Sequence, residues 1–201
     1  MSDDDTASPA AVLRSFAARA VDADPASLGG RIELVERGDE SEADDAARSD
    51  GSTPAGRLAE LLGEADSVVA VVPRFDADLA GRLNESLAAE GDGTEGEDDS
   101  ESGASAPQEV RVVFTGAAAD RLDGATGPVV RRALADRGVD AYRHEGESPV
   151  AVVLADDRAS VGLIDGDGVA ALLWTDDPAV REWAAATCRR YLDAAEPVTG
   201  G

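Results

Sequence analysis

The side chains best suited to hold a ligand stand at the ends of three predicted β-strands. They are Arg74, Thr115 and the adjacent pair Arg143-His144. Open α/β sheets bind their ligands at the carboxyl ends of parallel strands, and a guanidinium group holds an anion through two parallel hydrogen bonds. We expect the three strand ends to form one cleft for a small anionic or hydroxylated, sugar-like molecule. For Arg143-His144, the favoured alternative is an ordinary exposed pair that leads into the loop at 145–147.

The elements after residue 138 show the clearest pattern. A short β-prone segment is followed by three more, and turns rich in Asp and Gly separate these three in the pattern of a meander, because tight hairpin turns need the positive φ that Gly supplies. These segments are 139–143, 149–154, 159–164 and 169–174. Asp177-Pro178 then suits the start of a helix, with Asp as the N-cap and Pro at the first helical position. The sequence therefore predicts an antiparallel meander followed by a helix that Pro197 ends.

This last helix carries an apolar stripe. Its members recur at spacings of three and four residues, and they are Val180, Trp183, Ala184, Thr187, Cys188, Tyr191 and Leu192. One side of the helix should therefore cover the sheet. Because Cys188 belongs to the stripe, we expect it to be a core residue rather than a nucleophile. A single cysteine also excludes an intrachain disulfide and a metal site of several cysteines.

The preceding chain alternates helices and strands. The expected helices are 9–21, with Val12, Leu13, Phe16 and Ala20 on its apolar side; 53–62; one that starts at Phe75 or Asp76 and runs through Leu79 and Leu83 to Leu87; 117–122; and 127–138. The expected strands are 31–36, 67–72 and 109–115. Segment 67–72 is apolar throughout, which is typical of a strand buried on both faces. The order predicts an α/β fold whose mixed sheet has parallel core strands extended by the antiparallel meander and closed by the C-terminal helix.

Two acidic segments contain too few apolar residues to pack in a core. Residues 38–52 are predicted to be a solvated linker, and residues 91–108 a disordered acidic insertion between a helix and a strand. We therefore divide the chain into two parts. Residues 1–53 are an acidic N-terminal extension with one helix and one strand before the linker, and residues 54–198 are a sensor-like α/β domain.

A family resemblance lies in the sequence VVLADDRASVGLIDGDGVAALLWTDDPAVREWAAATCRRYLDAAEPV, residues 152–198. The residues that carry it are Asp156-Asp157-Arg158 in a hairpin turn and Trp183-Ala184, Tyr191 and Ala195-Glu196-Pro197 in and after the helix. The pattern resembles the end of the effector-sensing domain in haloarchaeal transcription regulators of the TrmB and methanogenesis-regulator type. It extends weakly back to about Asp66. The resemblance implies a phospholipase D-like fold and the binding of an effector.

The chain departs from the proteins it resembles in two respects. Phospholipase D chemistry needs a His nucleophile with a Lys two positions on, whereas this chain has one His and no Lys. The regulators bind DNA through a winged helix-turn-helix with a basic face, but residues 1–65 offer two short helices and a strand. Residues 1–108 contain eight Arg against 26 acidic residues. We therefore expect no enzymatic activity, no cofactor, no metal site and no direct contact with nucleic acid.

The composition indicates the environment of the protein. The 201 residues carry a net charge of −24, all 18 basic residues are Arg, and 3% of the residues are aromatic. Such a chain resembles the proteins of halophiles that accumulate salt, in which molar salt screens the repulsion between acids. A partly disordered acidic protein is the alternative. Without an apolar run of 18 residues or a targeting signal, the chain is expected to be cytoplasmic and to make no membrane contact.

Two functions fit the sequence. The first is a ligand-sensing or regulatory domain that acts without its own DNA-binding domain, which makes a separate DNA-binding protein an expected partner. The second is a structural or protein-interaction module of the same fold, present as a homodimer and without a ligand. A small anionic or sugar-like ligand that stabilises the native chain would separate the first function from the second.

Overall fold

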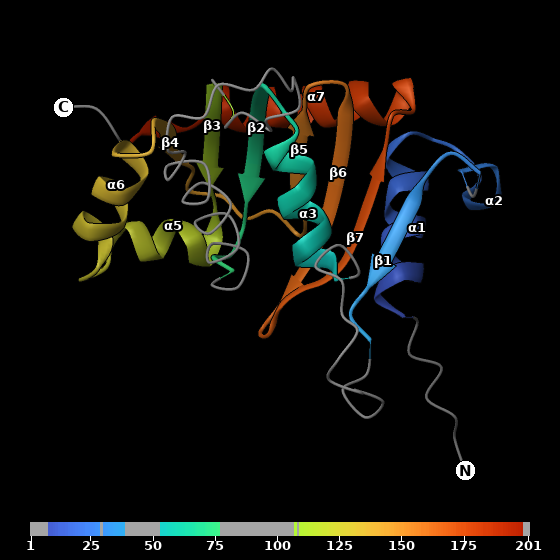
Figure 1. Cartoon of the computed structure of the whole chain (residues 1–201), viewed down its shortest axis with the longest axis horizontal. Coiled ribbons are helices and arrows are strands. Elements are labelled where there is room, and N and C mark those ends of the chain that lie inside the picture. The colour runs from blue at the N-terminus through green and yellow to red at the C-terminus, as the bar shows by residue number, and fades with distance from the viewer. Residues whose placement is uncertain (1–7, 29, 39–52, 77–106, 108, 199–201) are drawn as a thin grey trace, which may run out of the picture.

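The computed structural model describes residues 8–28, 30–38, 53–76, 107 and 109–198. These residues form three layers, in which one mixed sheet lies between two layers of helices (Figure 1). The strand order across the sheet is β1-β7-β6-β5-β2-β3-β4-β8. The strands are β1 Glu33–Glu36, β2 Ser67–Val72, β3 Glu109–Phe114, β4 Val139–Arg143, β5 Ala151–Ala155, β6 Arg158–Asp165, β7 Gly168–Thr175 and β8 Glu196–Pro197.

The sheet combines a parallel part with an antiparallel part. Strands β2, β3 and β4 are parallel, with Val110 of β3 opposite Val68 on one side and Val139 on the other. Strands β5, β6 and β7 form the predicted antiparallel meander. The two parts are joined because β5 pairs antiparallel with β2. The prediction of a parallel core extended by antiparallel strands is therefore confirmed.

Helices cover both faces of the sheet. On one face lie α1 (Pro9–Ala20) and α7 (Pro178–Asp193), with the single turn α2 (Pro25–Leu28) beside α1; on the other lie α3 (Pro54–Gly63), α5 (Gly116–Asp123) and α6 (Gly127–Ala135). Side-chain caps begin α3 and α7 at the predicted residues. Thr53 Oγ1 accepts a hydrogen bond from Gly56 N (3.1 Å), and Asp177 Oδ1 accepts one from Ala179 N (2.9 Å).

Successive side chains of each strand point to opposite faces, so the sheet has a core on each side. Under α1 and α7, the largest fully buried side chains are Leu13, Val71, Val113, Val152, Val161, Leu173, Val180 and Cys188. Under α3, α5 and α6, the buried side chains include Leu58, Leu61, Leu172, Trp174, Phe114 and Leu122. The prediction that the apolar stripe of α7 covers the sheet, with Cys188 in the core, is confirmed.

The N-terminal elements belong to the same sheet as the rest of the described chain. Strand β1 pairs antiparallel with β7, with Leu34 opposite Leu173. Helix α1 is held against β1 by a hydrogen bond from Ala10 N to Glu36 Oε2 (3.0 Å), and Arg37 pairs with Asp165 (3.2 Å) at the β6–β7 turn. The predicted division at residue 53 therefore does not coincide with a break in the sheet, because β1 completes one edge of it.

Two details of the predicted elements are wrong. Val12, which was placed on the apolar side of α1, is 43% exposed, and Ala17 and Ala18 are buried instead. Helix α7 ends at Asp193 rather than at Pro197, which pairs with β4 at the edge of the sheet, where a missing N–H is tolerated.

Three predictions lie outside the described residues. They are the helix through Leu79, Leu83 and Leu87, and nearly all of the insertion at 91–108 and of the linker at 38–52.

Candidate ligand site

The parallel strands bring the predicted site residues to one edge of the sheet. The three turns that follow β2, β3 and β4 are joined by backbone hydrogen bonds. His144 N donates to Phe114 O (2.9 Å), Gly116 N to Gly146 O (3.2 Å) and Ala118 N to Pro73 O (3.1 Å). The three strand ends thus meet, as the order of the elements predicts, and backbone hydrogen bonds join the turns that follow them.

Thr115 lies beneath this edge rather than on it. Thr115 is 0% exposed, and its Oγ1 atom has no hydrogen-bond partner among the described residues. Thr115 precedes α5 without capping it through the side chain. Gly116 follows with a φ of +49°, a conformation that suits glycine. A ligand at the surface therefore has no direct access to the Thr115 hydroxyl.

Arg143 is already surrounded by carboxylates. Its guanidinium group is 2.8 Å from Asp123, 3.7 Å from Glu196 and 3.9 Å from Glu145, and the side chain is 28% exposed. An exposed ion pair contributes only about 0–1 kcal/mol, but three carboxylates together offset the charge that an anionic ligand would need. Binding at Arg143 therefore requires the ligand to displace groups of the chain itself.

His144 fastens the loop after β4 to the C-terminal helix. Its Nδ1 accepts a hydrogen bond from Gly146 N (2.8 Å), so in this arrangement the proton of the neutral ring is on Nε2. The ring lies 4.9 Å from that of Tyr191, whose hydroxyl donates to Glu147 O (3.0 Å). A Cβ on Gly146 would be 2.7 Å from the imidazole, so an alanine there would have to displace the ring. His144 thus has a clear positioning role.

Arg74 is the exposed cation of this edge. It makes no ion pair with any of the residues that the structure describes. Next to it, the Phe75 ring stacks on Phe114 at 4.9 Å, and the Arg121 guanidinium lies 5.6 Å from the Phe75 ring. Of the four residues predicted from the sequence, Arg74 has the side chain that is most available to a ligand.

A concave region lies next to this edge, on the far side of Tyr191. It has a volume of about 360 Å³ and is enclosed by α1, by α7 and by the segment that enters β5. We call it the α1–α7 groove. Its lining residues are Phe16, Arg19, Ala20, Ser148, Pro149, Val150, Val152, Trp183, Thr187, Arg190 and Tyr191. The sequence offered one clue to it, the spacing of Trp183, Thr187 and Tyr191 along α7, which was assigned to the core alone.

Aromatic rings and an oriented hydroxyl shape the groove. The rings of Phe16 and Trp183 meet edge to face, with centroids 5.7 Å apart. The guanidinium of Arg190 lies 5.4 Å from the Tyr191 ring. Ser148 Oγ donates a hydrogen bond to Val150 O (2.6 Å), which leaves its lone pairs as acceptors. The groove thus offers an apolar floor with polar groups at its margin, as small-molecule sites do.

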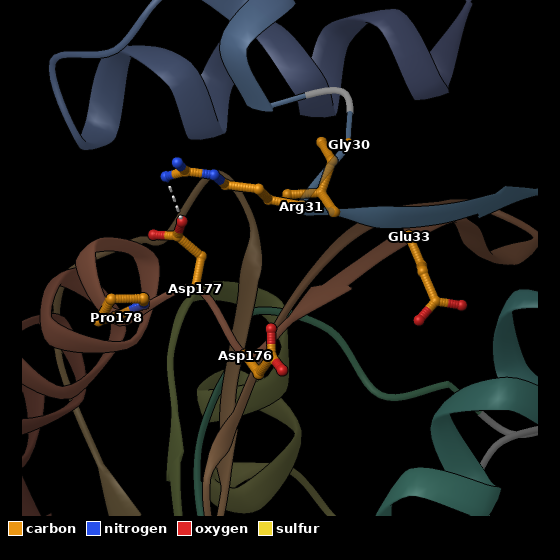
Figure 2. Close-up of a pocket in the computed structure, with 7 residues that line it drawn as sticks. Gly30, Arg31, Glu33, Asp176, Asp177 and Pro178 are labelled. Carbon is orange, nitrogen blue, oxygen red and sulfur yellow. Dashed lines mark hydrogen bonds and ion pairs between the residues drawn. The ribbon is translucent and has the colours of Figure 1, made fainter.

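A second concave region, of about 580 Å³, lies between the start of β1 and the start of α7. Figure 2 shows the Arg31 side chain extended to Asp177, at 3.2 Å. The polar groups here hold the chain together: Thr175 Oγ1 donates to Arg31 O (2.6 Å), and Asp177 caps α7. Glu33 and Asp176 line the remainder, so the region is acidic and its one Arg is paired. Its contacts have a structural role.

The described residues offer little for covalent or metal chemistry. They contain no group of three or more His, Cys, Asp or Glu side chains that could hold a metal ion. Burial raises the pKa of the Cys188 thiol to about 12, so the thiol is protonated at neutral pH and is a poor nucleophile. No described helix has both the length and the apolar character needed to cross a membrane.

A known family model matches the middle and C-terminal part of the chain. Residues 100–194 match the family model described as "Methanogenesis regulatory protein FilR1, middle domain". This stretch includes every element from β3 to α7 and amounts to just under half of the chain. The match confirms the resemblance to transcription regulators of the TrmB and methanogenesis-regulator type. Among curated protein sequences, none matches the chain.

Solved structures with a similar fold include a phospholipase D family member. This is Nuc from Salmonella typhimurium, with a TM-score of 0.52 and 11% identity, covering 84% of this chain and 98% of that chain. NucT from Helicobacter pylori has a TM-score of 0.46 at 13% identity, covering 83% and 98%. The archaeal chromatin protein TrmBL2 has a TM-score of 0.49 at 13% identity, covering 84% of this chain and 54% of that chain. The chain thus has a phospholipase D-like fold and spans about half of TrmBL2.

Proposed function

We propose that this chain is a ligand-sensing regulatory domain that acts on transcription without a DNA-binding domain of its own. The observation that carries the proposal is the match of residues 100–194 to the middle domain of a methanogenesis regulator. The groove beside α7 supports it, because a sensor needs a concave site for its effector. In this proposal the protein is cytoplasmic, and a separate DNA-binding protein carries its signal to a promoter.

The packing of the N-terminal elements supports the absence of an internal DNA reader. A winged helix-turn-helix presents a recognition helix with a basic face to the major groove. Here α1 buries Leu13, Ala17 and Ala18 against the sheet, and β1 is a strand of that sheet. Neither element is available to form an independent DNA-binding unit.

The chemistry of the chain supports a function other than catalysis, despite the phospholipase D-like fold. That chemistry needs a His and a Lys two positions on, and the chain has no Lys. Its one His accepts a hydrogen bond from Gly146 N and packs against Tyr191. Both contacts fit a positioning role.

A protein-interaction module without a ligand is the alternative function. The observation that favours it is at the strand ends, where Arg143 is paired with three carboxylates and Thr115 is covered. Under this alternative, Arg74 and the neighbouring aromatic residues would contact a second copy or another protein.

Thermal unfolding in molar KCl tests the proposal. The full chain is heated alone and with sugars, sugar phosphates, nucleotides and small organic acids, each over a range of concentrations. A ligand that binds only the native state stabilises it by about 2.7 kcal/mol at a hundred times its dissociation constant, which raises the melting temperature measurably. A saturable rise with one ligand class supports sensing. No rise with any class leaves the interaction module as the better explanation.

A further inference from the structure

We propose that the α1–α7 groove is the effector site and that its ligand is an amphipathic organic acid, with one carboxylate on an aromatic or aliphatic body. This inference rests on the proposed sensing function and assigns it a place and a ligand class. The groove is separate from the strand-end residues that the sequence indicates, although Tyr191 borders both.

The aromatic walls of the groove favour a ligand whose main part is apolar. Phe16 on α1 and Trp183 on α7 present ring surfaces that meet edge to face, and Tyr191 continues the aromatic wall. All three side chains are only partly buried, so part of each ring remains exposed to solvent in the described structure. Covering apolar surface contributes roughly 25 cal/mol per Å². The volume of about 360 Å³ is at the small end of the range for ligand sites, which suits a compact molecule.

The arginines at the rim of the groove favour a ligand with a negative charge. Arg19 from α1 and Arg190 from α7 both line it, and neither forms an ion pair with a carboxylate of the described residues. Among the residues that the structure describes, no Asp or Glu lines the groove, although the chain has 42 acidic residues and a net charge of −24. A groove with cations and no acids is unexpected in so acidic a chain. A carboxylate can form paired hydrogen bonds with a guanidinium group, and such contact pairs persist better in high salt than long-range attraction does.

Occupation of the groove would tie together elements that are far apart in the sequence. The ligand would contact α1 through Phe16 and Arg19, α7 through Trp183 and Arg190, and the entry to β5 through Ser148. Tyr191 in turn packs on His144, which holds the loop after β4. Binding would therefore strengthen the attachment of α1 to α7, a change that a partner protein could recognise.

The test uses the full chain in molar KCl with 3-phenylpropionate and octanoate as probes. Their neutral amides, 3-phenylpropionamide and octanamide, have nearly the same shape without the charge. Binding is followed by titration calorimetry and by tryptophan fluorescence, because Trp183 lines the groove while Trp174 is buried on the other face of the sheet. We expect saturable binding of at least one acid, a change in fluorescence, and at least tenfold weaker binding of its amide.

Two double variants with the same change of net charge localise the site. Arg19→Gln with Arg190→Gln removes the two cations of the groove, whereas Arg14→Gln with Arg189→Gln removes two exposed arginines on the same helices that do not line it. We expect the first variant to bind the acid at least tenfold more weakly and the second to bind within twofold of the parent. Circular dichroism checks that both variants are folded.

Each other outcome overturns the proposal. No binding of either acid, equal losses in the two double variants, or equal affinity for acid and amide each removes the groove as a carboxylate site. A dimer that only the Arg19→Gln/Arg190→Gln variant loses would show that a second copy occupies the groove. If sugars or nucleotides stabilise the chain while the acids do not, the groove assignment fails and ligand sensing stands. If no ligand class stabilises it, both fail.

Discussion

The ends of strands β2–β4 and the α1–α7 groove both present arginines, but in different surroundings. At the strand ends, the Arg143 guanidinium lies within 4 Å of three carboxylates from separate parts of the chain. In the groove, Arg19 and Arg190 line the same surface as aromatic rings, and none of the acidic residues that the structure describes lines it. The comparison teaches that in a strongly acidic protein the type and position of a cation do not identify a site. We expect a ligand where a cation has no carboxylate partner among the described residues, a condition that Arg19 and Arg190 meet in the groove and that Arg74 meets at the strand ends.

The largest effect should come from removing salt, because it acts on both regions at once. Replacing molar KCl with dilute buffer lengthens the screening distance from about 3 Å to 10 Å or more. The 42 acidic residues then repel one another with 18 Arg to offset them, and we expect loss of the helical circular dichroism signal. An undiminished signal and melting temperature would show that local pairs, such as those at Arg143, suffice without screening.

Trp183→Ala should have the next largest effect. The ring packs against the core and meets Phe16 edge to face, so its removal should lower the free energy of unfolding by about 3 kcal/mol. Urea unfolding in molar KCl measures this loss, and Trp183→Phe, which keeps a ring, should lose much less. Equal stability of parent and Trp183→Ala would mean that the groove wall is not part of the core.

Gly146→Ala tests the order of the strand-end region. The added Cβ would lie 2.7 Å from His144 Cε1, and displacing the imidazole should destabilise the fold by about 1–2 kcal/mol. His144→Ala removes the obstacle, so the glycine substitution should have little effect in that background. A double-mutant cycle measures the difference. Additive losses would show that His144 does not hold this loop.

Arg143→Ala should change stability by less than about 1 kcal/mol, because each of its partners forms a partly exposed pair. It should also leave the affinity for 3-phenylpropionate within twofold of the parent, as measured by calorimetry. A tenfold loss of affinity would instead place the ligand at the strand ends, where the sequence indicates it, and would reverse the comparison.

Cys188 should show the smallest effect, an almost undetectable reaction with a disulfide reagent at pH 8 in the native state. The thiol is 1% exposed, and burial raises its pKa to about 12. Because the folded pKa is above the ordinary thiol pKa of 9.0, the protonated thiol favours the native state at lower pH, and this contribution is lost as the pH rises from about 9 to 12. Rapid reaction at pH 8 would show that α7, one wall of the groove, readily leaves the sheet.

Features that depend on neighbouring residues were predictable from the sequence. Strand β2 has the predicted bounds, and Thr53 and Asp177 are the N-caps of α3 and α7, as capping rules indicate. The meander follows from Asp/Gly turns between β-branched segments. The convergence of three turns at one sheet edge also follows, because the alternation of helices and strands predicts parallel pairing.

The sequence by itself determined the strand and helix segments, the mixed sheet, the excess of acids and the residue types available for binding. Tertiary structure alone decided that β1 pairs with β7, that Asp123 and Glu196 meet Arg143, and that Phe16 and Trp183 face one another. These contacts join residues separated by long stretches of chain, and local periodicity does not specify which distant surfaces meet. These tertiary contacts therefore decide whether an arginine is paired with a carboxylate or is available to a ligand.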